Sequence, residues 1–116
     1  DMLYTEFNVG EKEYKLRLNA RNVVALERKL GKNPISIFGG IENNELPKLE
    51  EVIPILHLSL QQFQNGISED DTYTIFDNYV DHGGDLVSLI PVILELYRSS
   101  GIIPKEKEKT GEDGKN

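Results

Sequence analysis

The side chains best suited to chemistry in this chain are its two histidines, His57 and His82. His57 lies in the apolar run Ile55-Leu56-His57-Leu58, a setting typical of a hydrogen-bonded core or boundary residue. His82-Gly83-Gly84 resembles the HGG oxyanion loop of esterases, but the chain has no GxSxG nucleophile elbow. The triplet is better explained as a helix end, where the dipole favours histidine and backbone freedom favours glycine.

The acidic residues follow no metal-binding spacing. The sequence contains no HExxH pair, no calcium-loop pattern and no cysteine. Gly39-Gly40 belongs to no GxGxxG or P-loop motif. We therefore expect no catalytic residue, no cofactor and no metal ion, and a protein that acts by binding.

Charge is distributed unevenly along the chain. The 116 residues carry a formal net charge of -7, which opposes broad binding to nucleic acid or anionic membranes. Residues 12–32 nevertheless hold seven of the nine Lys and Arg that precede residue 104. Residues 33–97 hold Lys48 as their one basic residue against eleven acidic ones. The sequence is thus electrically polarised.

No apolar run reaches the roughly 18 residues that a transmembrane helix needs. The first residues also lack the basic-then-apolar order of a signal peptide. We expect a cytoplasmic protein with no membrane partner.

A β-hairpin is predicted at the start of the chain. Apolar side chains alternate with polar ones on both sides of Gly10, at Leu3, Thr5, Phe7 and Val9 and again at Tyr14, Leu16 and Leu18. A lone hairpin is marginally stable in water, so its apolar face must lie on helices.

Four helices are predicted after the hairpin. Asn19 caps the first and Gly31 ends it; the second runs from about Pro47 to Asn65 and contains Pro54. An apolar turn containing Ile35, Ile37 and Phe38 lies between them. The capping box Ser68–Asp71 opens the third helix, which stops at Gly83-Gly84, and Asp85 caps the last, which closes at Gly101. The expected core stripes are Ala20, Val23, Leu26 and Leu30; Leu49, Val52, Ile53, Leu56, Leu60 and Phe63; Tyr73, Phe76 and Val80; and Leu86, Ile90, Ile93, Leu94 and Tyr97.

These elements predict an α+β fold in which an N-terminal antiparallel hairpin packs on a bundle of about four helices. Residues 1–103 form the single domain. Residues 104–116 contain many charged residues and almost no apolar ones, and we expect a disordered tail there.

Two helices carry charged stripes. Arg21, Arg28 and Lys32 are spaced i, i+7, i+11, which places them within about 40° of one another on a helix. Asp70, Asp77 and Asp81 repeat this spacing with the opposite sign. Both stripes are either solvated helix faces or recognition surfaces that meet an opposite charge on a partner or on a second copy.

Aromatic residues surround much of the third helix. Tyr73, Phe76 and Tyr79 flank Ile75, so this helix contributes either to a covered core or to a groove for a partner helix. The candidate protein-binding residues are Arg17, Arg21, Arg28, Lys32, Asp70, Asp77, Asp81, Tyr73, Phe76 and Tyr79.

Four stretches resemble the small tail assembly chaperones of long-tailed phages and Gram-positive prophages. They are EFNVGEKEYKLRLNARNVVALERKLGKNPISIF, ILHLSLQQFQNGIS, IFDNYVDHGG and LIPVILELYRSSGII, and together they span residues 6–103. The hairpin leading into LRLNARNVVALERKLG is the most distinctive of these features.

The resemblance implies a non-enzymatic role in the cytoplasm of a bacterial host. Such proteins bind the tape-measure protein, keep it soluble and help to recruit tail-tube subunits. Self-association is a further expectation, in which the basic side of one copy contacts the acidic side of the next. The alternatives are a structural tail or head–tail connector protein and a small acidic regulator or inhibitor protein.

Overall fold

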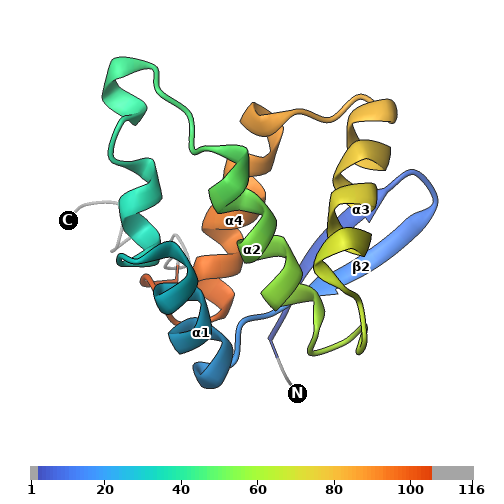
Figure 1. Cartoon of the computed structure of the whole chain (residues 1–116), viewed down its shortest axis with the longest axis horizontal. Coiled ribbons are helices and arrows are strands. Elements are labelled where there is room, and N and C mark those ends of the chain that lie inside the picture. The colour runs from blue at the N-terminus through green and yellow to red at the C-terminus, as the bar shows by residue number, and fades with distance from the viewer. Residues whose placement is uncertain (1–2, 106–116) are drawn as a thin grey trace, which may run out of the picture.

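A computed structural model describes residues 3–105 and has the α+β fold that the sequence predicts (Figure 1). The elements are β1 (Thr5–Val9), β2 (Lys12–Leu16), α1 (Ala20–Leu30), the 3-10 helices η1 (Pro34–Phe38) and η2 (Ile41–Asn43), α2 (Leu49–Leu60), α3 (Glu69–Asp81) and α4 (Leu86–Ser99). The disordered tail expected at 104–116 lies almost entirely outside the described residues.

The hairpin is antiparallel and has the predicted buried face. β1 and β2 pair antiparallel, with Phe7 opposite Tyr14, and the buried side of β1 carries Thr5, Phe7 and Val9. Gly10 starts the two-residue turn with φ +60°, a conformation that glycine adopts without strain. A Cβ on Gly10 would lie 2.6 Å from Nε2 of His82, so the turn packs closely on the end of α3.

Local capping chemistry sets where the helices begin. The Asn19 side chain accepts from the backbone N–H of Asn22, and Gly31 ends α1 in the left-handed conformation. Ser68 and Asp71 form the predicted reciprocal capping box of α3. Asp85 caps α4 as expected, with Ser88 completing the box. These cap predictions are confirmed.

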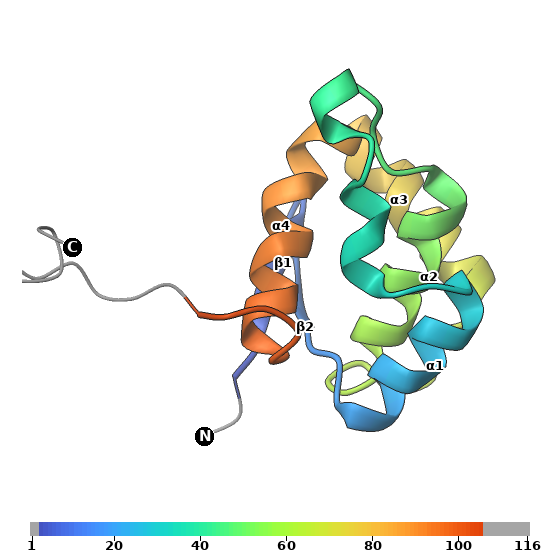
Figure 2. The same ribbon diagram turned by 90° about the vertical axis from the view of Figure 1, so that its left-hand side faces the viewer.

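The helices and the hairpin form two layers. α1, α2 and α3 lie together on one side of the molecule, and α4 lies beside the hairpin on the other (Figure 2). α2 packs between α1 and α3 and also contacts β2, while α4 contacts β1. The core between the layers includes Leu16, Leu26, Ile53, Leu89 and Tyr97, all fully buried.

Several predicted core positions are wrong. Phe63 follows α2, which ends at Leu60, and its side chain is 38% exposed. On α3 the buried residues are Thr72, Ile75 and Phe76, whereas Tyr73 and Val80 are both 46% exposed. Neither a threonine nor three closely spaced aromatic residues reveal which side of a helix faces the core. On α4 the predicted stripe missed two of the residues that are most deeply buried, Leu89 and Leu96.

Among residues 3–105, none of the helices is long and apolar enough to cross a membrane.

Candidate protein-binding groove

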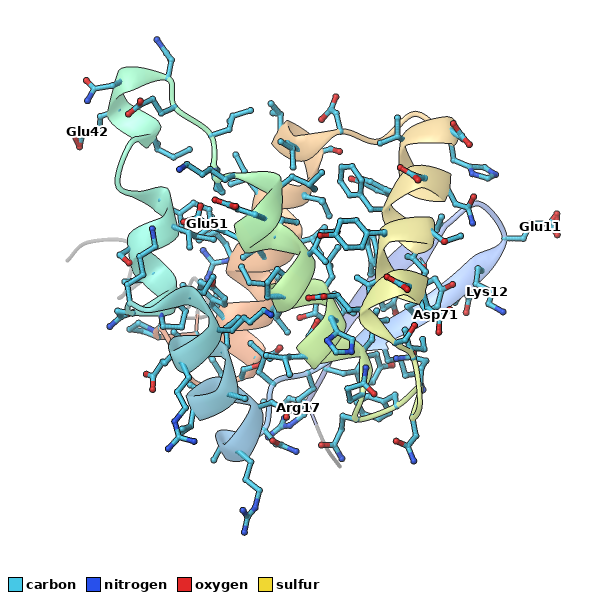
Figure 3. All side chains as sticks on the ribbon, viewed as in Figure 1. Glu11, Lys12, Arg17, Glu42, Glu51 and Asp71 are labelled. Atoms are coloured by element: carbon cyan, nitrogen blue, oxygen red, sulfur yellow. The ribbon has the colours of Figure 1, made fainter. Side chains whose placement is uncertain are left out.

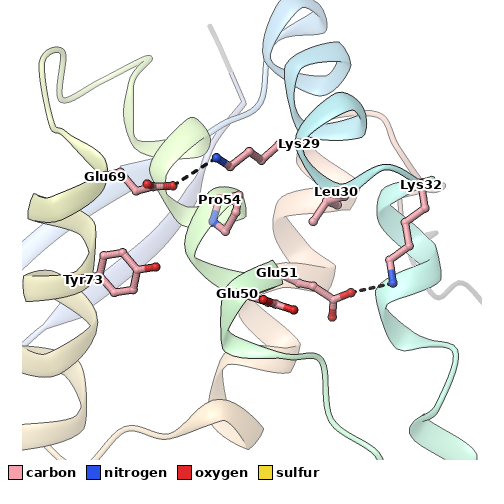
Figure 4. A pocket seen from close by; sticks show the side chains of 8 residues that line it. All are labelled: Lys29, Leu30, Lys32, Glu50, Glu51, Pro54, Glu69 and Tyr73. Atoms are coloured by element: carbon pink, nitrogen blue, oxygen red, sulfur yellow. Dashed lines mark ion pairs between the residues drawn. The ribbon is translucent and has the colours of Figure 1, made fainter.

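A groove runs along the outer side of α2, between α1 and α3. It consists of two adjoining depressions of about 500 and 330 Å³ that share Lys29, Pro54 and Glu69. The larger is also lined by Leu30, Lys32, Glu50, Glu51 and Tyr73, and the smaller by Ala25, His57 and Leu58. We call this combined surface the α2 groove, and Figure 4 shows the residues that line its larger depression.

The smaller depression of the α2 groove is mainly apolar, whereas charged side chains line most of the larger one. Pro54 lies at the centre of the groove, with Ala25 and Leu58 towards the end of α2. Proline has no backbone N–H, so the carbonyl of Glu50 lacks its helical donor four residues on.

His57 has a structural role at the edge of the groove. Its Nε2 lies 3.1 Å from the carbonyl oxygen of Ile67, which also accepts a 2.7 Å hydrogen bond from the Gln61 side chain. These bonds hold the α2–α3 connection against α2. The interpretation of His57 as a hydrogen-bonded boundary residue is confirmed.

An ion pair crosses the groove above Pro54. Lys29 Nζ on α1 lies 3.8 Å from Glu69 Oε2 on α3, as the dashed line in Figure 4 marks. The two side chains are 58% and 44% exposed. Exposed pairs of this kind contribute only about 0–1 kcal/mol to stability, so the contact is easily broken.

Lys32, the third residue of the basic stripe, forms an ion pair with α2 and is therefore not available with Arg21 and Arg28. Its Nζ lies 2.6 Å from Glu51 Oε2, and the Glu51 side chain is only 16% exposed. Burial alone would raise the pKa of the Glu51 carboxyl, but hydrogen bonds from Lys32 and from the Lys48 backbone, with the charges of both lysines, lower the pKa overall. Lys32 therefore joins the end of α1 to the first turn of α2.

The other two residues of the basic stripe lie beside the groove. Arg21 and Arg28 are exposed on the side of α1 away from buried Leu26. They line a shallow surface with Ala25, and Ala25 also lines the α2 groove. The Arg21–Arg28 surface is therefore continuous with the groove on its α1 side.

The acidic stripe lies on the opposite side. Asp70, Asp77 and Asp81 are exposed on α3, and Asp70 and Asp77 stand one turn before and after Tyr73. Tyr73 lines the groove. The two stripes thus flank a single groove, which is an arrangement that their sequence positions do not reveal.

Two of the three candidate aromatic residues are not free for docking. The Phe76 side chain is 9% exposed and packs in the core. The Tyr79 ring lies 5.1 Å from that of Phe7, and its hydroxyl is hydrogen-bonded to Ser88. For these two residues the covered-core alternative is the correct one, and Tyr73 alone of the three lines the groove.

Arg17 lies away from both stripes. Its Nη1 donates a 2.8 Å hydrogen bond to the carbonyl of Leu3, which holds the segment before β1 against the residue that follows β2. Figure 3 labels Arg17. We assign Arg17 to support of the hairpin.

Lys29, Glu69 and Pro54 were not among the sequence-based candidates. Lys29 and Glu69 are 40 positions apart, and no local spacing relates them. Pro54 was noted only as a residue inside the second predicted helix. Sequence patterns within one helix could not identify a groove built from three.

Within residues 3–105, no group of three or more His, Asp or Glu side chains is placed to hold a metal ion. No curated protein and no solved structure matches this chain. One family model matches residues 4–115, almost the whole sequence. The chain belongs to the family that this model describes, a family of unknown function (DUF6096).

Proposed function

We propose that this chain is a non-catalytic phage or prophage tail assembly chaperone that binds helical segments of the tape-measure protein in the α2 groove. The observation that carries the proposal is the pair of adjoining depressions between α1 and α3, in which apolar residues lie between charged side chains. A groove of this form fits an amphipathic helix, which buries its apolar face against the floor. The resemblance of residues 6–103 to tail assembly chaperones supplies the biological setting.

The proposed chaperone role explains why the apolar surface of the α2 groove is shallow and is divided between two depressions. A tape-measure protein is long, helical and prone to aggregate, so its chaperone needs modest contacts that can be repeated along a rod and later released. Tyr73 contributes such a contact, because its ring is 46% exposed at the groove wall. Recruitment of tail-tube subunits and release before the tail is complete belong to the same proposal.

The test begins with the neighbouring genes, where the proposal expects a reading frame for a tape-measure protein, and proceeds to co-expression of that product with this chain. We expect the tape-measure protein to become soluble, and we expect Tyr73→Ala to reduce the soluble fraction. Val87→Ala is the matched control, because Val87 is an apolar residue on α4 that is 59% exposed outside the groove. A tape-measure protein that is equally insoluble with and without the chain overturns the proposal.

Mass spectrometry of purified particles separates this role from that of a structural tail or connector protein. A chaperone is absent from the finished virion, whereas a structural component is present in it.

Self-association of the chain is part of the proposal for assembly. Light scattering at low and high salt tests it, because contacts between basic and acidic surfaces weaken as salt screens them. A chain that stays monomeric at both salt concentrations removes self-association from the proposal.

A further inference from the structure

The two sides of the α2 groove carry opposite charge. On the α1 side stand Arg21, Arg28 and Lys29, all exposed. The one acidic residue of α1, Glu27, lines a different depression together with Ile35. We call this α1 side of the groove the basic bank.

The α3 side has the opposite composition. Every charged residue from Glu69 to Asp81 is acidic. Glu69 lines the groove itself, and Asp70 and Asp77 extend the charge along the outer side of the helix. We call this side the acidic bank.

In the chain without a partner, the two banks contact each other directly. Lys29 and Glu69 reach across the floor to within 3.8 Å. A helix lying on Ala25 and Leu58, over the buried Pro54, takes the place of this contact. Lys29 then needs an acidic partner on one flank of that helix, and Glu69 needs a basic partner on the other flank.

The direction of a bound helix follows from this requirement. Turning an amphipathic helix end for end, with its apolar face still on the floor, exchanges its two flanks. A helix with one acidic and one basic flank therefore matches both banks in only one of its two directions. Charges that become repulsive in the wrong direction disfavour it more strongly than the correct contacts favour the right one.

We infer that the α2 groove selects an amphipathic helix with an acidic flank and a basic flank, and that the banks fix the direction in which this helix lies. The inference rests on the proposed function, because it takes the groove to be the binding site for a partner helix. It adds the chemistry of that partner, with acidic residues beside α1, basic residues beside α3 and an apolar seam on α2.

Synthetic peptides of about 18 residues test this inference, since helices much shorter than this are unstable in water. Two peptides share one composition and one apolar seam but have their Glu and Lys flanks exchanged. A spin label at the peptide N-terminus broadens the NMR signals of the nearest residues in the full chain. We expect one peptide to broaden signals near Glu50 and the other to broaden signals near Ala25, because these residues line opposite ends of the groove.

A third peptide, with the same charges mixed on both flanks, provides the affinity comparison. We expect it to bind about tenfold more weakly than the two segregated peptides. The double variant Lys29→Glu/Glu69→Lys keeps an ion pair across the groove but reverses its polarity. We expect this variant to lower the ratio of the two orientations at least about threefold for each segregated peptide.

Three outcomes overturn the inference: the same end is broadened by both peptides, both ends are broadened equally, or none of the peptides binds. The solubility of the co-expressed tape-measure protein is measured independently of these three outcomes. If the tape-measure protein stays insoluble on co-expression, the proposed function is wrong. If only the expected peptide directions fail, the inference about the charges of the partner helix is wrong and the proposed function is unaffected.

Discussion

The ammonium of Lys32 lies 2.6 Å from the carboxylate of Glu51, joining the residue just beyond α1 to the first turn of α2. This ion pair fixes the end of α1 at the end of the α2 groove where Glu50 lies. It also separates Lys32 from Arg21 and Arg28, with which it shares a helical stripe in the sequence but not a role in the fold.

Lys32→Ala is expected to destabilise the chain by about 1 kcal/mol, since it leaves a largely covered carboxylate without its partner. Arg28→Ala is the matched control on the same stripe and is expected to change the free energy of unfolding by less than about 0.5 kcal/mol. Urea denaturation followed by circular dichroism measures both. Equal decreases in the free energy of unfolding of the two variants would show that the Lys32–Glu51 pair does not stabilise the fold.

Stability is expected to decrease in acid because two carboxyl groups have lowered pKa values in the folded chain. Hydrogen bonds from the backbone and side chain of Ser68 lower the pKa of Asp71 from 3.8, and the net effect on Glu51 is a pKa below 4.5. A lowered folded pKa means that the unfolded chain binds protons first. The contribution is therefore complete above about pH 5 and is lost as the pH falls through the folded-state values.

Unfolding free energies measured from pH 6 to about pH 3 test this expectation. The Glu51→Gln variant cannot titrate at this position, so its stability should fall less steeply over the same range. An identical slope in the variant and the parent chain would contradict the assignment to Glu51.

Gly84→Ala is expected to destabilise the chain by about 1–3 kcal/mol through overpacking. A Cβ at this position would lie 2.3 Å from the Tyr79 ring, which is held between Phe7 and Ser88. The φ angle of Gly84 is not positive, so the cost comes from the contact and not from backbone strain.

A double-mutant cycle with Tyr79→Ala isolates this contact. The Gly84→Ala penalty should largely disappear once the ring has been removed. Additive losses in the double variant would show that the destabilisation has another origin.

Tyr97→Phe is expected to cost about 1–2 kcal/mol. The Tyr97 hydroxyl is fully buried and donates a 3.0 Å hydrogen bond to the carbonyl of Pro34, which fixes η1 against α4. Burial and, to a lesser degree, the charge of Glu51 raise the pKa of this phenol far above its ordinary value.

Alkaline difference spectroscopy provides an independent measurement. We expect the phenol of Tyr97 to ionise only as the chain unfolds, so the folded Tyr97→Phe variant should lose none of the phenolate signal that appears before unfolding. A smaller signal from the folded variant would place the Tyr97 hydroxyl in contact with solvent.

The start of each helix was predictable wherever capping chemistry decides it. Asn19, Ser68 and Asp85 bind backbone N–H groups within three residues of themselves, so their effect is present in any short stretch of sequence. The hairpin was predictable for a related reason. Alternation on both sides of Gly10 specifies which face of the hairpin is buried.

The end of α2 was not predictable, because contacts distant in sequence determine it. The helix was expected to continue to Asn65 but ends at Leu60. Beyond it, the Gln64 side chain exchanges hydrogen bonds with the backbone of Lys15, and Phe63 packs 5.6 Å from the ring of Tyr4. The gain from these contacts with the hairpin competes with another helical turn.

By itself the sequence determined the α+β class, the caps, the buried face of the hairpin and the two charged stripes, since each depends on residues within a few positions of one another. Only the tertiary structure decided that Lys29 meets Glu69 across Pro54, that Lys32 is paired with Glu51, and that the stripes flank one groove. The physical reason is that a helix fixes the angular positions of its own side chains through its 3.6-residue period. Its neighbours, by contrast, are fixed by how the whole core packs around α2.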